Sequence, residues 1–200
     1  MALLLDRTGR GPEAEALARR NLQTAGEALG ASDAITLEAA ERLGVILWHL
    51  GETELAETVL RKNVQDRRRV LKPEHPDTLR SVYLLSRVLR ELKRFADAEE
   101  FGYDYAHSVQ CSLGSNHPDY IAALTNQADV YRDKGDLVQA ERHYGHAARQ
   151  ARALFGAVHP KSRAAQEQHE IAVRALDGRS DGVQRVTETA ESLAQPTSQE

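Results

Sequence analysis

The sequence is poor in the groups that cross-link small proteins or bind metals. Its one cysteine, Cys111, excludes an internal disulfide, and no spacing of cysteine and histidine matches a structural zinc site. The apolar run at residues 1–5 is followed at once by Asp6 and Arg7, so it is too short for a signal peptide or a membrane span. We therefore expect a cytoplasmic protein with no metal, no other cofactor and no membrane partner.

Basic charge and catalytic motifs are also lacking. Lys and Arg number 26 against 30 Asp and Glu, a net charge of −4, which is far from the basicity of a nucleic-acid-binding domain. No nucleophile motif, glycine-rich phosphate loop or zinc-protease helix signature is present. We therefore expect neither a nucleic-acid partner nor an enzymatic activity.

Proline and aromatic residues are scarce as well. Aromatic residues make up 5% of the chain, and the six prolines lie outside the stretches in which apolar residues recur every three or four positions. This pattern predicts an all-α protein.

A repeat of 42 residues organises the helical stretches. His-Pro pairs begin at His75, His117 and His159, each 42 residues after the one before. The same shift superposes Leu71 on Leu113, Asp77 on Asp119, Val88 on Val130, Ala98 on Ala140 and Glu99 on Glu141. The chain is therefore predicted to be an array of equivalent units.

Each unit is predicted to contain two helices. The first is expected at 34–50, 76–92, 118–134 and 160–176, and the second at 52–70, 94–112 and 136–154. The prolines of the His-Pro pairs fall in the first turn of the first helix, where a missing N–H costs nothing. Gly51 and Gly135 lie between the two helices, and glycine readily adopts the left-handed conformation that ends a helix. Lys93 holds the equivalent place in the second full repeat.

These units resemble a known repeat. Residues 71–79 (Leu-Lys-Pro-Glu-His-Pro-Asp-Thr-Leu), 113–119 and 155–160 are similar to the repeat openings of the kinesin-light-chain type of tetratricopeptide repeat. Residues 123–131 resemble that family's helix A, and residues 135–141 its helix B. The resemblance covers about residues 12–176. It implies a right-handed α-α superhelical solenoid whose helix A faces line a concave groove for a peptide or partner protein.

The repeat register divides the chain into six parts. We expect a partial repeat, mainly a helix B, at residues 1–28, repeats at 29–70, 71–112 and 113–154, a capping helix at 155–177 and a polar tail at 178–200. Glu170 replaces the small residues Gly44, Ser86 and Ala128, which favours a polar outer face on the last helix. Residues 183–194 are expected to form a short helix and residues 195–200 to be disordered. Because the first helix A would begin before residue 1, we expect a piece of a longer array, with residues 3–7 as the remnant of that helix.

Some histidines and a basic run invite other interpretations. The histidines of the His-Pro pairs recur with the turn, which favours a structural role. His143 and His146 have the spacing of a two-ligand metal site, but no third ligand accompanies them. The basic run at residues 61–72 suits the binding of phosphate or of a membrane surface, or a helix end where cations complement the dipole, and we favour the helix end.

The surface predicted to bind a partner is the groove side of the helix A positions. The candidate residues are Arg42, Arg80, Tyr83, Leu84, Arg87, Arg90, Asn126, Asp129 and Arg132, with Glu38 and Glu41 beside them. Arginines along one helical stripe, with apolar residues between them, suit an acidic extended peptide with one apolar anchor. By the resemblance, Asn126 matches an asparagine that holds the backbone of a bound peptide.

The sequence thus predicts a non-enzymatic protein-interaction module, an adaptor or scaffold that binds an acidic partner segment. One alternative is a structural assembly segment that stacks on the rest of a longer repeat array, or on another copy, through its open N-terminal repeat, where Leu3, Leu4, Leu5 and Leu17 leave apolar surface. Another is the regulatory arm of a larger signalling protein.

Overall fold

The computed structural model describes the backbone of residues 10–194 and the side chains of residues 10–178. This part of the chain forms eight helices and no strand, so the all-α prediction is confirmed. The helices are α2 (Gly11–Leu29), α3 (Ala34–His49), α4 (Thr53–Leu71), α5 (Pro76–Glu91), α6 (Phe95–Leu113), α7 (Pro118–Lys134), α8 (Leu137–Phe155) and α9 (Pro160–Ala194). The expectations for residues 3–7 and 195–200 lie outside the described residues. None of the described helices combines the length and apolar character of a membrane span.

Side chains cap the helices that open each repeat. Before α3 the carboxylate of Asp33 accepts a hydrogen bond from the N–H of Ile35 at 2.8 Å. Before α5, α7 and α9 a histidine Nδ1 accepts from the N–H two residues later, at 3.2 Å in each case. These histidines are His75, His117 and His159. Their structural role in the recurrent turn is therefore confirmed.

The turn between the two helices of a repeat requires a left-handed backbone. Gly51 with φ 82° and Gly135 with φ 91° provide it at no steric cost. At the equivalent place Lys93 adopts φ 58°. The second repeat thus keeps the same turn with a lysine, although a side chain there is strained.

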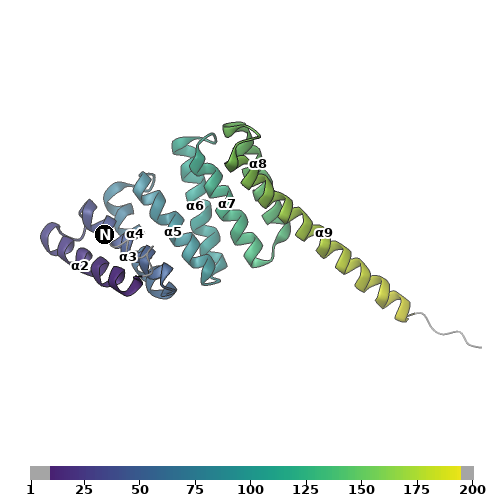
Figure 1. The fold of residues 1–200 in the computed structure, drawn as a ribbon, viewed down its shortest axis with the longest axis horizontal. Coiled ribbons are helices and arrows are strands. Elements are labelled where there is room, and N and C mark those ends of the chain that lie inside the picture. The colour runs from purple at the N-terminus through teal and green to yellow at the C-terminus, as the bar shows by residue number, and fades with distance from the viewer. Residues whose placement is uncertain (1–9, 195–200) are drawn as a thin grey trace, which may run out of the picture.

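The helices pack in chain order along the long axis of the molecule (Figure 1). Beyond these sequential neighbours, α3 contacts α5 and α5 contacts α7. These three helices form the closer, inner layer, and α4, α6 and α8 form the outer layer. Because the inner layer is the more tightly spaced, the stack curves into the predicted superhelical solenoid. We call the surface of α3, α5 and α7 turned away from the outer layer the groove face.

Small residues set the distance between the two helices of a repeat. A Cβ atom on Gly44 would lie 2.7 Å from Cγ of the buried Leu60, so only glycine fits between α3 and α4. At the equivalent place in the next repeat, the hydroxyl of Ser86 donates to the carbonyl of Ala98 at 3.0 Å. In the third repeat Ala128 is completely buried. The two helices of each repeat thus approach closely in all three repeats.

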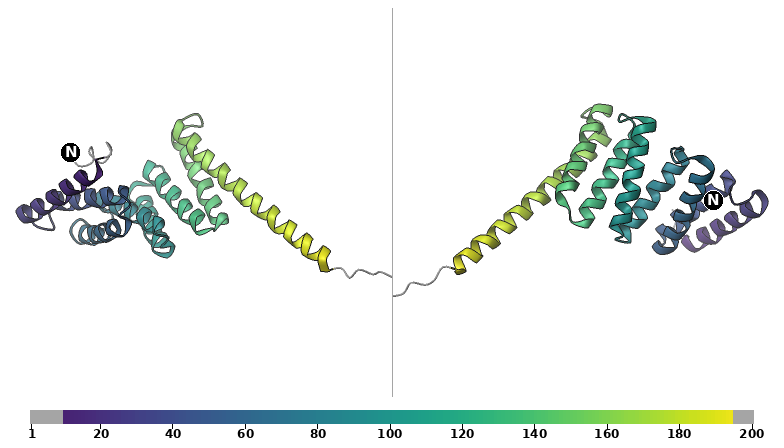
Figure 2. Two further views of the ribbon diagram at one scale, coloured as in Figure 1. Left: turned by 60° about the horizontal axis from the view of Figure 1, so that its bottom comes forward. Right: turned by 180° about the vertical axis from the view of Figure 1, so that it is seen from behind.

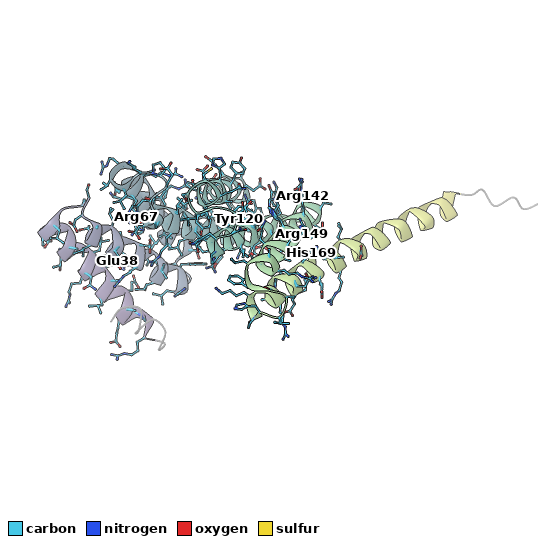
Figure 3. All side chains as sticks on the ribbon, turned by 90° about the horizontal axis from the view of Figure 1, so that it is seen from above. Glu38, Arg67, Tyr120, Arg142, Arg149 and His169 are labelled. Atoms are coloured by element: carbon cyan, nitrogen blue, oxygen red, sulfur yellow. The ribbon has the colours of Figure 1, made fainter. Side chains whose placement is uncertain are left out.

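A buried polar cluster joins α3, α4 and α5. The guanidinium of Arg67, labelled among these helices in Figure 3, lies 2.5 Å from the carboxylate of Glu41 and donates to Ser81 at 2.7 Å. Ser81 donates to Glu41 at 2.9 Å, and the amide of Asn63 donates to the carbonyl of Leu37 at 2.7 Å. Glu41 was expected on the groove face, and its burial corrects that expectation. The carboxylate is drawn inward because Arg67 is buried and needs a counter-charge.

The last helix departs from the sequence prediction. We expected it to end near residue 176 and a separate short helix to follow at 183–194. Instead, α9 is one helix of 35 residues that projects from the solenoid (Figures 1 and 2). Asp177 stands where Gly51 and Gly135 make the turn in earlier repeats, and the nearest glycine, Gly178, comes one residue later. A lone glycine costs a helix only about 1 kcal/mol, which does not end it.

The outer side of α9 is polar at the position where the earlier inner helices pack against an outer helix. Glu170 is exposed, and it accepts a hydrogen bond from Gln166 at 3.1 Å and lies 3.6 Å from Arg174. The aligned residues Ser86 and Ala128 are buried against their outer helices. A charged side chain at this place disfavours the packing of one more helix.

Candidate functional site

At the centre of the groove face a guanidinium lies between two aromatic rings. Arg87 of α5 lies 4.6 Å from the ring centroid of Trp48 on α3 and 5.6 Å from that of Tyr83. Leu84 is half-buried beside them, and the indole N–H of Trp48 donates to Glu91. Within residues 10–178 no carboxylate lies within ion-pair distance of Arg87. Its position is therefore fixed by ring faces, and its charge is available to a ligand.

Arg80 shares a carboxylate with a second arginine. Its side chain is 60% exposed and lies 2.6 Å from Glu41, which also contacts the buried Arg67. Two guanidinium groups against one carboxylate leave a net positive charge at this edge of the groove face. Arg42, in contrast, pairs with Glu38 at 2.5 Å on the exposed side of α3.

Arg90 and Arg132 are neutralised by two acids of α7. Arg90 lies 2.5 Å from Asp129 and 3.3 Å from Asp133, across the boundary between α5 and α7. Arg132 lies 3.1 Å from Asp129 and 3.0 Å from Asp133. Two cations and two anions thus form one network. This part of the arginine stripe is satisfied within the fold.

Tyr144 of α8 also bonds to that network. Its hydroxyl accepts from Arg132 at 2.7 Å and donates to Asp129. Burial, and then the hydrogen bond to Asp129, raise the pKa of the Tyr144 hydroxyl, so it remains a donor at neutral pH. Burial lowers the pKa of Arg132, but Tyr144, Asp129 and Asp133 outweigh this effect and raise it. Arg132 therefore stays charged at neutral pH.

The contacts between neighbouring inner helices recur with the repeat. At the boundary of α3 and α5 an indole meets a guanidinium and a carboxylate. At the boundary of α5 and α7 a guanidinium meets two carboxylates in the same register. The aligned pairs are Trp48 and Arg90, Arg87 and Asp129, and Glu91 and Asp133. The same arrangement of positions thus holds a cation without a carboxylate partner among the described residues at the boundary of α3 and α5, and fully paired charges at the boundary of α5 and α7.

Asn126 does not lie open on the groove face, contrary to the sequence prediction. Its side chain is buried, and its Nδ2 donates to the hydroxyl of Ser86 at 2.9 Å. Gly102 lies beside it, and a Cβ atom there would be in ordinary van der Waals contact with that nitrogen at 3.5 Å. The amide joins α7 to α5 inside the fold. Its expected role of holding a peptide backbone is therefore corrected.

The predicted candidates omitted Trp48, which the structure places at the centre of the groove face. It aligns with Arg90 and Arg132, and both of those were placed on that face. The 42-residue register was thus a sufficient signal to find it.

The paired histidines of α8 pack as ordinary side chains. His143 stacks on Tyr131 with ring centroids 5.2 Å apart, and His146 meets the edge of Tyr120 at 5.8 Å. No cluster of three potential metal ligands occurs in the part of the chain whose side chains are described.

The basic run at the end of α4 is matched by acids of the outer layer. Arg61 lies 2.9 Å from Asp97, and Arg68 lies 3.0 Å from Asp104. Both guanidinium groups also lie over the ring of Phe101. The run joins α4 to α6 and offers little free charge to a phosphate.

Comparison with known proteins agrees with this architecture. Family models described as tetratricopeptide repeats match residues 35–105 and residues 1–20 and 121–146. The chain is a tetratricopeptide repeat protein. Among curated proteins, none matches it in sequence.

Several solved structures resemble this tetratricopeptide repeat protein. A putative kinesin light chain of Podosopora anserina with nearly identical TPR-like repeats is 21% identical, with a TM-score of 0.80 over 100% of this chain and 94% of that chain. A point variant of it is also 21% identical, with a TM-score of 0.81 over 96% and 90%. BtubC (BKLC) from P. vanneervenii is 16% identical, with a TM-score of 0.76 over 100% and 81%. At these identities the likeness shows a kinesin-light-chain-like fold.

Proposed function

We propose that this tetratricopeptide repeat protein is a non-enzymatic module of the cytoplasm that binds an acidic segment of a partner protein on its groove face. The observation that carries the proposal is Arg87. It is a cation held between Trp48 and Tyr83, with no acidic partner in the described part of the chain. A partner carboxylate would complete this site with a charge-assisted hydrogen bond.

The neighbouring residues define the partner segment further. Arg80 adds a second, largely exposed cation two helical turns from Arg87 on the same helix. Leu84 lies between them and is half-buried, so it suits an apolar side chain of the segment. Arg42, Arg90 and Arg132 are already paired and have a smaller part. The proposed ligand is therefore an extended segment with two carboxylates and an apolar residue between them.

The test uses the one tryptophan of the chain as its reporter. Trp48 contacts Arg87, so its fluorescence should respond when an acidic peptide binds there. Fluorescence polarisation of a labelled peptide provides a second readout that is independent of Trp48. Arg87→Gln should weaken binding by about tenfold or more, the value of one charge-assisted bond.

The matched control is Arg142→Gln. Arg142 is an exposed arginine on α8, at the other end of the solenoid from Glu38 (Figure 3). This variant should bind as the wild type does, and circular dichroism should show that both variants keep their helices. Equal binding by Arg87→Gln and the wild type would contradict the proposal.

A second candidate function, self-association through the N-terminal repeat, is favoured by a specific feature. A hollow of about 600 Å³ lies between α2 and α3, and its lining combines alanine, leucine and isoleucine with polar and charged side chains. An open apolar surface at one end of a repeat array favours an additional helix.

A further inference from the structure

The hollow at the N-terminal end has the character of a helix-binding surface. It is lined by small and apolar side chains together with polar and charged ones. The lining includes Ala18, Asn21, Ala25, Ala28, Ile35 and Ala39. Ile35 is 60% exposed, which is unusual for a side chain beside a hydrophobic core.

The next repeat shows what such a surface holds. The aligned pairs are Asn21 and Asn63, Ala25 and Arg67, and Ala39 and Ser81. In the next repeat all three positions bond to α3, through the carbonyl of Leu37 and the carboxylate of Glu41. The hollow is therefore the seat of an inner helix. We call it the N-terminal seat.

The opposite end of the molecule carries a helix whose last part projects from the solenoid. Among the described helices α9 packs against α8, and its part beyond Gly178 projects from the solenoid in every view (Figures 1 and 2). At 35 residues α9 is about twice as long as α3, α5 or α7, which have 16 or 17. The projecting part thus has the length of one inner helix. A lone helix of this length is marginal in water unless an apolar face is covered.

The sequence of the projecting part provides such a face. Val183, Val186, Ala190 and Leu193 recur at the spacing i, i+3, i+7 and i+10, which places them on one side of a helix. Gly182 adjoins this stripe and permits close approach to another helix.

We propose that the projecting part of α9 in one copy docks in the N-terminal seat of a second copy, so that copies join head to tail. The inference deepens the self-association named above, and it is independent of the groove face. Alanines form part of the seat, the stripe includes Ala190 and Gly182 adjoins it, so the two surfaces permit a short distance between helix axes. Asn21 is exposed and its amide has no partner in the described residues. It would donate to a backbone carbonyl of the docked helix, as Asn63 does to Leu37.

The polar cap on α9 makes this the favoured way to join two copies. Glu170 and Arg174 cover the side on which a further repeat would stack, so direct packing of one end on the other would bury charge. A helix that reaches past this cap avoids that cost. Because the seat and the helix lie at opposite ends of the molecule, the contact is heterologous and does not close as a dimer.

Light scattering coupled to size-exclusion chromatography tests the inference on the full chain. The wild type should gain mass with concentration and grow beyond a dimer. A seat variant, Ala28→Glu with Ile35→Glu, and a helix variant, Val186→Glu with Leu193→Glu, should each stay monomeric. Ala28 and Ile35 are exposed, so the seat variant should keep its fold.

Mixing the two variants gives the sharpest outcome. The seat variant retains an intact α9 and the helix variant retains an intact seat, so one junction forms between them. An equimolar mixture should therefore form a dimer that does not grow further. Val158→Glu replaces an apolar side chain that is 77% exposed outside the seat, and Gln184→Glu lies off the apolar stripe. Both controls should associate as the wild type does.

The results separate this inference from self-association in general. Growth of the helix variant at the wild-type rate, or a mixture that stays monomeric, would overturn the docking of α9 and leave self-association through another surface. A wild type that stays monomeric throughout would overturn both.

Discussion

Glu41 of α3 and Arg67 of α4 form an ion pair inside the solenoid, with side chains only 1% and 4% exposed and 2.5 Å between their charged groups. Ser81 of α5 bonds to both, so three consecutive helices meet at one pair of charges. A buried pair of this kind tolerates the loss of one partner poorly, because the remaining charge is left without compensation.

Replacement of Glu41 should therefore destabilise the first two repeats strongly. In Glu41→Leu the buried guanidinium of Arg67 keeps only the carbonyl of Asp77 and the hydroxyl of Ser81. We expect the free energy of unfolding to fall by about 3–5 kcal/mol, measured by urea denaturation followed by circular dichroism. Adding Arg67→Met should restore part of the loss, because it removes the orphaned charge. A double variant as unstable as the sum of the two single variants would contradict this account.

Two glycines in helices should respond to alanine in opposite ways. In Gly44→Ala the new Cβ would lie 2.7 Å from Leu60, which is completely buried, so we expect a loss of about 1–3 kcal/mol in the free energy of unfolding. Gly26 of α2 is the matched control, since the nearest atom to its Cβ is Thr36 at 4.0 Å. Gly26→Ala should gain up to about 1 kcal/mol from helix propensity. The two midpoints of thermal unfolding, measured side by side, check both expectations.

The sequence predicts most of the fold because the helix signals of one repeat recur at the same positions in the next. Helices α3 to α8 begin and end within one residue of their predicted places. The signals there are local: a proline in the first turn, a capping side chain and a glycine after the last turn. The prediction was wrong at α9. There Gly178 lies one residue out of the repeat register, and the helix continues through it.

The candidate site was harder to predict because charge pairing depends on distances between helices. Arg87 and Arg90 look equivalent in the sequence, yet Arg87 lies against Trp48 while Arg90 lies between Asp129 and Asp133. Helical spacing predicts the face on which a side chain lies. It does not predict which residue of the neighbouring helix that side chain contacts. Asn126 shows the same limit, since its amide donates to Ser86 on the neighbouring helix.

Mild acid should destabilise the third repeat through two histidines of α8. Burial, and then nearby positive charge, lower the pKa of His143 and His146, so the folded state favours their neutral forms. As the pH falls below the ordinary histidine pKa of about 6.5, the unfolded chain takes up these protons first. The stability that their neutral forms contribute above that pH is then lost.

Thermal unfolding measured from about pH 7.5 down to 5.5 checks this expectation, in a range that lies above the titration of most carboxylates. The wild-type midpoint should fall on acidification. A variant with His143→Gln and His146→Gln should show a flatter profile. His107→Gln, at an exposed site on α6, should keep the wild-type slope. An unchanged slope in the double variant would assign the effect to other groups.

Release of the closed ion-pair network should strengthen the binding of acidic peptides. In a variant with Asp129→Asn and Asp133→Asn, Arg90 and Arg132 lose their carboxylate partners but keep amides to contact. We expect the dissociation constant for an acidic peptide to fall by about two- to fivefold, since a partly exposed ion pair is worth at most about 1 kcal/mol. Fluorescence polarisation measures the change. Glu38→Gln, which releases Arg42 at the exposed edge, is the comparison, and it should have the smaller effect.

The spacing of acids in the peptide should matter as much as their number. Arg80 and Arg87 are seven residues apart on α5, which corresponds to about 10 Å along a helix. A segment in the polyproline II conformation advances by about 3.1 Å per residue and has three residues per turn, so carboxylates three residues apart share one face and reach both cations of α5. Peptides of one composition, with their two acids three or five residues apart, should therefore differ by about fivefold or more in dissociation constant, because only the shorter spacing satisfies both contacts. In Arg80→Gln the second contact is lost, and the preference for spacing should disappear while binding through Arg87 persists. Equal affinity of the wild type for the two peptides would show that the segment does not lie along α5.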